Sequence, residues 1–227
     1  MKIYVDSANI ESIKRVMDLC PVAGVTTNPT ILSREKRNPW ESLYNIRRLI
    51  GDAIELHTQV VSQKTEDMVE EAQFIVKRLG KNTFIKVPVS FEGFKAIRKM
   101  KSLGLNVTAT AVFTPMQALV ASLCGATYLA PYVNRVDMIS GDGVSLVQNI
   151  QSLLEKQGSK AEVLAASFKS VEQILRVALT GAKCITASPS LWLEVLRHPL
   201  TDHAIQGFTT DFEKLTAPGK TLATTVK

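Results

Sequence analysis

A single lysine stands inside the apolar stretch Thr83-Phe84-Ile85-Lys86-Val87-Pro88-Val89. β-Branched and aromatic residues that end at a proline are typical of a short buried strand. A lysine in such a strand either reaches a strand end or a carboxylate, or is kept because its amine does chemistry. Burial penalises the charged form and lowers the pKa of a lysine, and the neutral amine is a nucleophile toward carbonyls. Lys86 is therefore our candidate for a Schiff-base nucleophile.

Strand-like segments of this kind alternate with helix-like segments almost to the end of the chain. We expect strands at Ile3–Asp6, Gly24–Asn28, Ile54–Val60, Thr83–Val89, Val107–Val112, Thr127–Val133, Glu162–Phe168 and Lys183–Ala187. Between them, segments such as Lys64–Leu79 place apolar residues on one stripe and charged residues on the opposite face, as amphipathic helices do. About eight such units in 227 residues predict an α/β fold, a (β/α)8 TIM barrel, for which roughly 250 residues is typical.

An open doubly wound sheet is the alternative fold. It usually has a glycine-rich phosphate turn after its first strand, and Asp6-Ser7-Ala8-Asn9 is not such a turn. The glycines of Ser140-Gly141-Asp142-Gly143 come late and fit a loop before a helix that starts near Gly143. The pairs Asn38-Pro39, Thr114-Pro115 and Ser188-Pro189 mark helix starts. We expect one domain over residues 1–215, which includes a C-terminal helix, and a tail over residues 216–227.

The charge balance is compatible with two kinds of partner. The formal net charge is +6, which suits either nucleic acid or phosphorylated metabolites. The positive residues are spread along amphipathic helices, and the 6% of residues that are aromatic do not interleave with a basic stripe as single-strand binding requires. We therefore expect no nucleic-acid partner. A nucleic-acid-binding protein remains an alternative, and its binding would depend steeply on salt.

The cysteines and the N-terminal segment indicate the compartment. Cys20, Cys124 and Cys184 are odd in number and unclustered, which favours reduced thiols over a disulfide or zinc framework. No apolar stretch is long enough to cross a bilayer, and residues 1–6 lack a signal-peptide core. We expect a cytoplasmic protein without a membrane partner.

Polar residues recur at one parity near the ends of the predicted strands. In a barrel, alternate residues face the interior, and active sites lie at the carboxyl end of the strands. The residues of this parity are Asp6, Thr26, Asn28, Gln59, Lys86, Thr108, Thr110, Tyr132 and Ser167. Each has an ordinary explanation, such as a helix cap at Asp6 or a turn at Asn28. Burying so many polar groups without function or mutual hydrogen bonds would cost about 1–3 kcal/mol each, so together they predict a site.

The same segments resemble a known family of enzymes. Six ordered blocks carry the resemblance: Val5-Asp6, Ala23-Gly24-Val25-Thr26-Thr27-Asn28-Pro29, Phe84-Ile85-Lys86-Val87-Pro88, Ala109-Thr110-Ala111-Val112, Ala130-Pro131-Tyr132-Val133-Asn134-Arg135 and Leu164-Ala165-Ala166-Ser167-Phe168-Lys169. From residue 1 to about residue 215 the chain resembles the transaldolase superfamily of class I aldolases and, within it, the small fructose-6-phosphate aldolase group.

The resemblance implies a role for each reacting side chain. Lys86 would form the Schiff base, and Asp6 would act on the hydroxyl next to the bond that breaks. Thr110 would hold the water used for proton transfer, with Gln59 and Tyr132 around it. Transaldolases carry a glutamate on the third strand and a phenylalanine on the sixth, whereas the aldolases carry glutamine and tyrosine, so Gln59 and Tyr132 indicate an aldolase.

The resemblance also implies how the substrate is bound. Asn28, with Thr26, would bind substrate hydroxyls, and Arg135 with Ser167 would bind the substrate phosphate. The family needs no metal or organic cofactor. Its small members form decamers in which the C-terminal helix, here Asp202–Leu215, reaches onto an adjacent subunit.

We therefore expect a class I aldolase that cleaves fructose 6-phosphate reversibly to dihydroxyacetone and glyceraldehyde 3-phosphate. A transaldolase, which transfers the dihydroxyacetone unit between sugar phosphates, is the alternative. Phe113 stands where the aldolases have tyrosine, and its parity points outward, so we expect a change of packing alone. The segment Thr186-Ala187-Ser188-Pro189 also departs from the usual exit of the eighth strand, which leaves the substrate range open.

A metal-dependent aldolase is a weaker alternative. His57, His198 and His203 have no ligand spacing around a carboxylate, so we expect no metal. His57 shares the inward parity of Gln59, and we interpret it as a wall residue of the pocket, with a catalytic role as the second possibility.

Overall fold

The computed structural model describes residues 1–225 of the chain. Parallel strands form a closed barrel in which neighbours follow chain order, and the last strand pairs with the first. The strands are β1 (Lys2–Asp6), β2 (Gly24–Thr26), β3 (Glu55–Gln59), β4 (Thr83–Pro88), β5 (Asn106–Val112), β6 (Tyr128–Pro131), β7 (Glu162–Ala165) and β8 (Cys184–Ala187). The predicted (β/α)8 barrel is confirmed, and the pairing of β1 with β8 excludes an open sheet.

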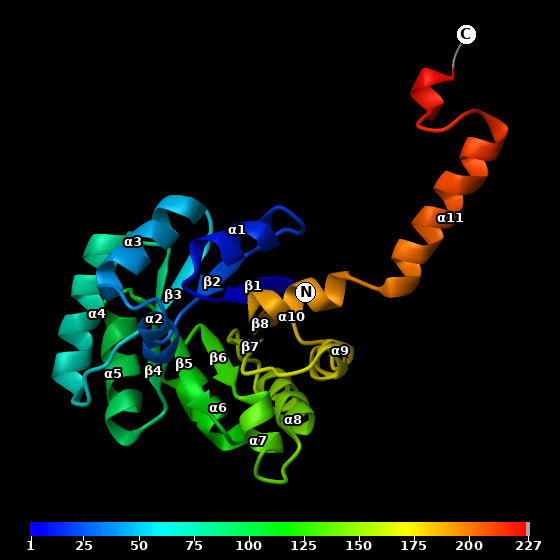
Figure 1. Cartoon of the computed structure of the whole chain (residues 1–227). Helices are drawn as coiled ribbons and strands as arrows, with labels where there is room; N and C mark the ends of the chain where they lie inside the picture. The colour runs from blue at the N-terminus through cyan, green and yellow to red at the C-terminus, as the bar shows by residue number, and fades with distance from the viewer. Residues whose placement is uncertain (226–227) are drawn as a thin grey trace. The chain divides into compact units, whose positions relative to one another are not determined.

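Helices connect successive strands and lie around the outside of the barrel (Figure 1). They are α1 (Ile10–Met17), α2 (Pro29–Arg34), α3 (Pro39–Ile50), α4 (Thr65–Leu79), α5 (Phe91–Ser102), α6 (Pro115–Leu123), α7 (Val133–Asp137), α8 (Gly143–Lys156) and α9 (Val171–Leu179). The helices α10 (Pro189–Leu196) and α11 (Pro199–Leu215) and the 3-10 turn η1 (Leu222–Thr224) follow β8. The predicted helix starts at Pro39, Pro115 and Pro189 are confirmed, and so is the loop before Gly143.

The chain divides into two compact units, residues 1–191 and the segment that begins at Trp192. The first unit contains the whole barrel. In the second, α11 begins at Pro199, earlier than the predicted Asp202. Proline suits the first helical position, and Nδ1 of His198 caps the helix by accepting the N–H of Leu200 at 3.2 Å. The single domain predicted for residues 1–215 stays a prediction, and residues 226–227 of the predicted tail lie outside the described residues.

Several predicted strands run past the observed strand ends at the carboxyl side of the barrel. β2 ends before Asn28, because the side chain of Asn28 caps α2. β6 ends before Tyr132, which is the N-cap residue of α7. The chain beyond β7 turns at Ser167, whose φ of 63° lies in the left-handed region. Polar residues that were assigned to strands therefore lie in the first loop positions above the barrel.

The strand register shows which side chains share the interior face. Residues paired across parallel strands point to the same face of a sheet, as do residues two apart along one strand. The relevant pairs are Asp6 with Thr26, Thr26 with His57, Gln59 with Lys86, and Pro88 with Thr110. His57 and Gln59 are two residues apart on β3, and Lys86 and Pro88 are two residues apart on β4. All of these paired residues therefore share one face of the sheet. The common inward face predicted from strand parity agrees with this register.

A layer of aromatic and aliphatic side chains fills the amino end of the barrel. The members of this cluster are Tyr4, Phe84, Tyr128, Leu164 and Cys184. The hydroxyls of Tyr4 and Tyr128 donate to the carboxylate of Glu55 at 2.8 and 3.2 Å. Burial raises the pKa of both phenols, so they remain protonated donors. Side chains thus fill the amino end of the barrel, and a site can form at its carboxyl end.

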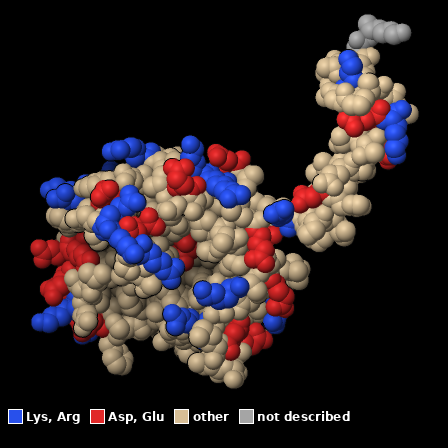
Figure 2. Space-filling view, in the orientation of Figure 1, with Lys and Arg blue, Asp and Glu red and all other residues tan. Residues whose placement is uncertain are grey.

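The surface charges are mixed in sign. On the face of the barrel unit shown in Figure 2, lysines and arginines alternate with aspartates and glutamates. Ion pairs of the barrel unit include Lys2–Glu162, at 3.1 Å, and Lys95–Glu92, at 2.6 Å. The net charge of +6 is therefore not gathered into a stripe on this face.

Candidate active site

Lys86 lies inside the barrel near the carboxyl end of β4. It is 5% exposed, and its Nζ donates a hydrogen bond to the backbone carbonyl of Thr27 at 2.8 Å. Burial lowers the pKa of the Lys86 amine, and the charge of Asp6 opposes this shift only in part. Lys86 forms no ion pair with any carboxylate among residues 1–225. The structure thus holds an amine that loses its proton more readily than an exposed lysine does.

The carboxylate of Asp6 is held by a chain of two threonine hydroxyls. Oγ1 of Thr26 donates to Oδ1 of Asp6 at 2.6 Å and also lies 2.6 Å from Oγ1 of Thr186. A hydroxyl has one proton, and a carboxylate accepts only. Since the Thr26 proton goes to Asp6, Thr186 must donate to Thr26. Both threonines are buried, at 1% and 2% exposure, so this chain fixes the orientation of the carboxylate.

Sequence reasoning missed the contribution of Thr186. On β8 this threonine alternates with Ile185 and Ala187, which is the same period-two signal that identified the other inward residues. Thr26 was predicted to bind substrate, whereas its hydroxyl is engaged with Asp6 in the structure. The substrate contact of Thr26 therefore remains a prediction beside an observed contact that orients Asp6.

The side chain of Asn28 carries an oxygen that is hydrogen-bonded within the chain and an NH₂ group that can donate. Its side-chain oxygen accepts the N–H of Ile31 at 2.9 Å and caps α2. The amide NH₂ group of the same side chain is not needed for this cap. The cap thus fixes the side chain beside β2 and leaves a hydrogen-bond donor for a ligand.

Tyr132 and Thr110 face each other at the carboxyl ends of β6 and β5. The Tyr132 hydroxyl lies 3.1 Å from Oγ1 of Thr110, and either group can donate. Burial raises the pKa of Tyr132, the negative charge of Asp6 adds to this shift, and the hydrogen bond from Thr110 and the charge of Arg135 oppose it. Tyr132 is therefore a neutral phenol at neutral pH, and a proton donor is present in the site.

A backbone irregularity follows Thr110. Ala111 has a φ of 56°, and the pairing of β5 with β6 shifts in register between Ala109 and Val112. Such a bulge turns the side chains that follow it and is frequent next to active sites. The predicted outward direction of Phe113 is wrong for this reason: its ring contacts the ring of Tyr132, with centroids 5.7 Å apart and an angle of 79°.

Gln59 ends β3 beside Lys86, with which it is paired in register. It is partly exposed and lines a groove of about 610 Å³ together with Val61, Pro88 and Phe91. The groove thus joins the loops after β3 and β4. The structure therefore brings Gln59 to the mouth of the barrel, as predicted. Its catalytic role beside Thr110 and Tyr132 stays a prediction.

Arg135 and Ser167 lie on neighbouring segments. Arg135 is on α7, is exposed, and is close enough to lower the pKa of Tyr132 by its charge. The residue before it, Asn134, donates its backbone N–H to the carbonyl of Ser167 at 2.8 Å. This hydrogen bond draws the two segments together, so a guanidinium and a hydroxyl flank the mouth of the barrel.

His57 lies one inward position below Gln59. It has no exposed surface, and its ring stacks on Phe84 with centroids 4.7 Å apart. Nδ1 is 2.9 Å from Oγ1 of Thr108, and Nε2 is 3.2 Å from the carboxylate of Glu55. Burial lowers the pKa of His57, with Glu55 opposing and Lys86 adding to this shift. The imidazole is therefore neutral and lies beneath the pocket, not in its wall as the parity suggested.

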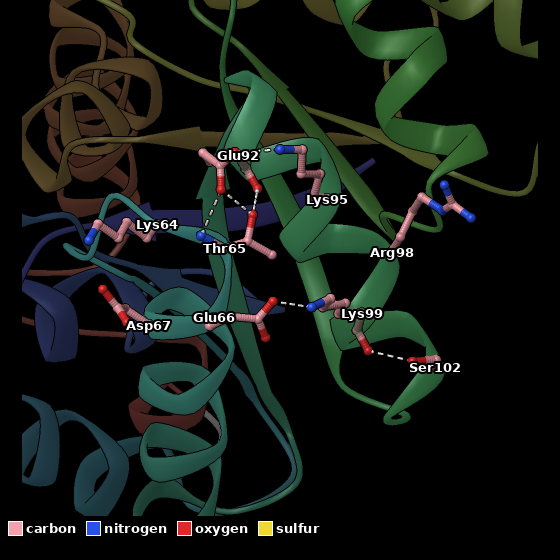
Figure 3. Close-up of a pocket in the computed structure, with 9 residues that line it drawn as sticks. All are labelled: Lys64, Thr65, Glu66, Asp67, Glu92, Lys95, Arg98, Lys99 and Ser102. Carbon is pink, nitrogen blue, oxygen red and sulfur yellow. Dashed lines mark hydrogen bonds and ion pairs between the residues drawn. The ribbon is translucent and has the colours of Figure 1, made fainter.

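A second groove, of about 760 Å³, lies between α4 and α5 on the outside of the barrel. Figure 3 shows that two of its cations face carboxylates: Lys95 contacts Glu92, and Lys99 contacts Glu66. Glu92 also accepts the N–H of Thr65 at 3.1 Å and so caps α4 from a neighbouring helix. These contacts lower the pKa of Glu92 to about 2. Two of the four cations that line this groove, Lys95 and Lys99, are thus paired with carboxylates.

Metal-dependent and membrane-spanning proteins each need a structural feature that can be checked within residues 1–225. Within residues 1–225, no three histidine, cysteine or acidic side chains converge as a metal site would need. No helix in the same range combines the length and the apolar character that a bilayer crossing demands.

Comparison with known proteins gives a match over nearly the whole chain. A model of the transaldolase/fructose-6-phosphate aldolase family matches residues 3–225. Among solved structures, "Native KDPGal structure" is similar, with 15% identity and a TM-score of 0.56 over 82% of this chain and 81% of that chain. Thiamine phosphate pyrophosphorylase from Pyrococcus furiosus has 16% identity and a TM-score of 0.58 over 86% of this chain and 93% of that chain. At such identities the structures show a shared barrel fold alone.

Proposed function

Because the chain belongs to the transaldolase/fructose-6-phosphate aldolase family, and is thus an enzyme of the aldolase/transaldolase type, we propose that it is a class I aldolase. The proposed reaction is reversible cleavage of fructose 6-phosphate to dihydroxyacetone and glyceraldehyde 3-phosphate. The observation that carries this proposal is the buried amine of Lys86, which donates to a backbone carbonyl and whose pKa is lowered by burial.

The first step uses that amine as a nucleophile. The neutral Nζ of Lys86 adds to the ketose carbonyl, and loss of water gives an iminium ion. The amide NH₂ of Asn28 donates to a substrate hydroxyl, because its oxygen is committed to the cap of α2. The positive iminium then withdraws electrons from the adjacent carbon–carbon bond.

Cleavage of that bond requires a base. The carboxylate of Asp6 takes the proton of the hydroxyl next to the bond, which breaks into an aldehyde and an enamine on Lys86. General acid–base help of this kind contributes about 10²–10⁴-fold. Thr26 and Thr186 serve the step by holding the carboxylate in one orientation.

The fate of the enamine distinguishes the two activities of the family. An aldolase protonates the enamine carbon, and hydrolysis of the imine then releases dihydroxyacetone. A transaldolase keeps the enamine until a second aldose phosphate accepts the three-carbon unit. The neutral phenol of Tyr132 beside Thr110, with Gln59 at the mouth, supports proton delivery through a water and hence release.

The phosphate of the substrate needs a cation at the mouth of the barrel. Arg135 gives charge-assisted hydrogen bonds to it, and Ser167 adds a hydroxyl where the backbone turns after β7. Barrels commonly hold phosphate in the loops after the seventh and eighth strands. The site needs neither a metal nor an organic cofactor for the steps above.

Borohydride trapping tests the nucleophile. Dihydroxyacetone and borohydride should leave a mass adduct on Lys86 in the wild type and none in Lys86→Met. Equal labelling of the two proteins would reject Lys86 as the Schiff-base residue. Lys81→Met, which alters an exposed lysine at the start of the loop before β4, is the matched control and should label normally.

A product assay separates aldolase from transaldolase. Free dihydroxyacetone should form from fructose 6-phosphate alone, and addition of erythrose 4-phosphate should divert little of it to sedoheptulose 7-phosphate. Efficient transfer with little free dihydroxyacetone would replace the aldolase assignment by the transaldolase.

We also propose a cytoplasmic homo-oligomer, a decamer as the resemblance implies. Helix α11 buries none of its residues within the chain, and its exposed apolar residues are Leu200, Ile205, Phe208 and Leu215. A helix with such a surface is normally covered by another chain. Sedimentation of the wild type should give an oligomer, and Phe208→Glu should shift it toward smaller species.

A further inference from the structure

Phe113 is the residue of the site whose position the strand pattern fails to predict. Straight alternation from Thr110 would turn it away from the barrel interior. The bulge at Ala111, with its φ of 56°, reverses the direction of the residues beyond it. The ring of Phe113 consequently meets the ring of Tyr132 edge to face, at 5.7 Å and 79°.

The backbone of Phe113 is also fixed. Its N–H donates to Oε1 of Gln117 at 2.9 Å, and the N–H of Thr114 donates to the same oxygen at 3.2 Å. Thr114 in turn caps α6. The ring of Phe113 is therefore presented from a rigid helix start, although 43% of its surface is exposed.

A phenol on a loop residue needs support to keep one orientation. Tyr132 precedes α7 and has no side-chain cap contact there. One side of its ring meets Phe113, and its hydroxyl meets Thr110. These two contacts constrain the ring and its hydroxyl.

We propose that Phe113 is a positioning residue that holds the Tyr132 phenol against Thr110 and thereby determines how often the enamine is protonated instead of transferred. This inference rests on the proposed function, since it concerns the enamine formed on Lys86. The relevant step is a proton transfer. A water held by Tyr132 and Thr110 gives a proton to the enamine carbon, a carbon–hydrogen bond forms, and the nitrogen becomes an iminium. The phenol returns a proton to the hydroxide that remains, and bulk water reprotonates the phenolate.

The measurement is the ratio of transferred to released dihydroxyacetone, with fructose 6-phosphate as donor and erythrose 4-phosphate as acceptor. In Phe113→Ala this ratio should rise about 2- to 12-fold, the range expected for loss of one aromatic edge-to-face contact. Phe113→Tyr keeps the aromatic ring and should stay within about 2-fold of the wild type. Phe113→Leu retains apolar bulk without an aromatic edge and should resemble Phe113→Ala.

Phe91→Ala is the matched control. Phe91 is 90% exposed at the groove beside Gln59, and it makes no ring contact with Tyr132 within residues 1–225. Its loss should leave the ratio unchanged. A rise in Phe91→Ala equal to that in Phe113→Ala would overturn the proposal, because any aromatic residue at the mouth would then have the same effect.

The variant Tyr132→Phe separates failure of this inference from failure of the proposed function. If it raises the ratio while Phe113→Ala does not, the phenol delivers protons without help from Phe113, and only the positioning role is wrong. If neither variant changes the ratio, proton delivery by Tyr132 is wrong as well. Absence of a borohydride adduct on Lys86 would reject the aldolase mechanism itself.

Discussion

The amine of Lys86 donates its hydrogen bond to the backbone carbonyl of Thr27, 2.8 Å away. A carbonyl supplies a dipole but no full negative charge, so it orients the amine without holding it in the charged form as a carboxylate would. Thr27 is itself buried, and its N–H donates to the carbonyl of His57 at 2.8 Å. Backbone hydrogen bonding between barrel segments thus fixes the Thr27 carbonyl that accepts from Lys86.

Lys86→Met should abolish aldol cleavage and increase stability. Burial lowers the pKa of Lys86, whereas an unfolded lysine stays charged up to about pH 10.4. Between the two pKa values the unfolded state binds more protons, so the free energy of unfolding of the wild type rises with pH. At pH 7 the free energy of unfolding of the variant should exceed that of the wild type by on the order of 1–4 kcal/mol, the range for replacing buried ionic groups by apolar ones. The difference should be smaller near pH 10. Urea titrations at both pH values measure this, and a less stable variant at pH 7 would contradict it.

Thr26→Val should lower kcat about 10- to 100-fold, because hydrogen bonds to charged groups are worth roughly 1.5–3 kcal/mol. If Thr26 acts through Asp6, KM stays near its wild-type value and Thr26→Ser restores activity. A rise in KM with kcat preserved would instead indicate direct substrate contact. Thr58→Val, a buried threonine of β3 on the opposite face, is the control for loss of a buried hydroxyl.

Arg135→Gln should lower kcat/KM for phosphorylated aldehydes and change it little for unphosphorylated ones. In the synthesis direction, kcat/KM for glyceraldehyde 3-phosphate should fall about 10- to 100-fold, while that for glyceraldehyde should change little. Arg98→Gln alters a cation at the outer groove between α4 and α5 and should affect neither aldehyde. Equal losses for both aldehydes would argue that Arg135 supports the loop instead of binding phosphate.

His57→Phe should flatten the acid side of the stability profile. Burial lowers the pKa of His57, and in the unfolded chain this residue takes up a proton below about pH 6.5. Stability of the wild type should therefore fall as pH decreases from 7.5 to 5. Phenylalanine keeps the stacking on Phe84 and removes the titration, so the slope should decrease. His203→Gln changes an exposed histidine and should keep the wild-type slope.

Period-two alternation was sufficient to predict most of the barrel and its interior. It placed Asp6, Gln59, Lys86 and Thr110 on one face, in agreement with the strand register. It did not predict what depends on interactions distant in sequence. His57 looks like a pocket residue by parity, yet packing against Phe84 and a contact with Glu55 place it below the pocket.

Backbone conformation was the second property that the period-two pattern of the sequence did not predict. An alanine at φ 56° gives no local signal of a bulge, so the direction of Phe113 was predicted wrongly. The same holds for Ser167, where the strand pattern continues in the sequence although the chain already turns at φ 63°. Positive φ is uncommon in residues other than glycine, and single-sequence patterns do not include it.

The filled amino end of the barrel has a kinetic consequence. Since the rings of Tyr4, Phe84 and Tyr128 occupy that end, in the aldol reaction that we propose the aldehyde would leave, and an acceptor would enter, at the carboxyl end of the barrel near Lys86. The two would therefore compete for the same opening, and an excess of the aldehyde should slow both turnover and transfer. Access to this end of the barrel, as well as the reactivity of the proposed enamine, would then limit how much of the three-carbon unit reaches a second sugar.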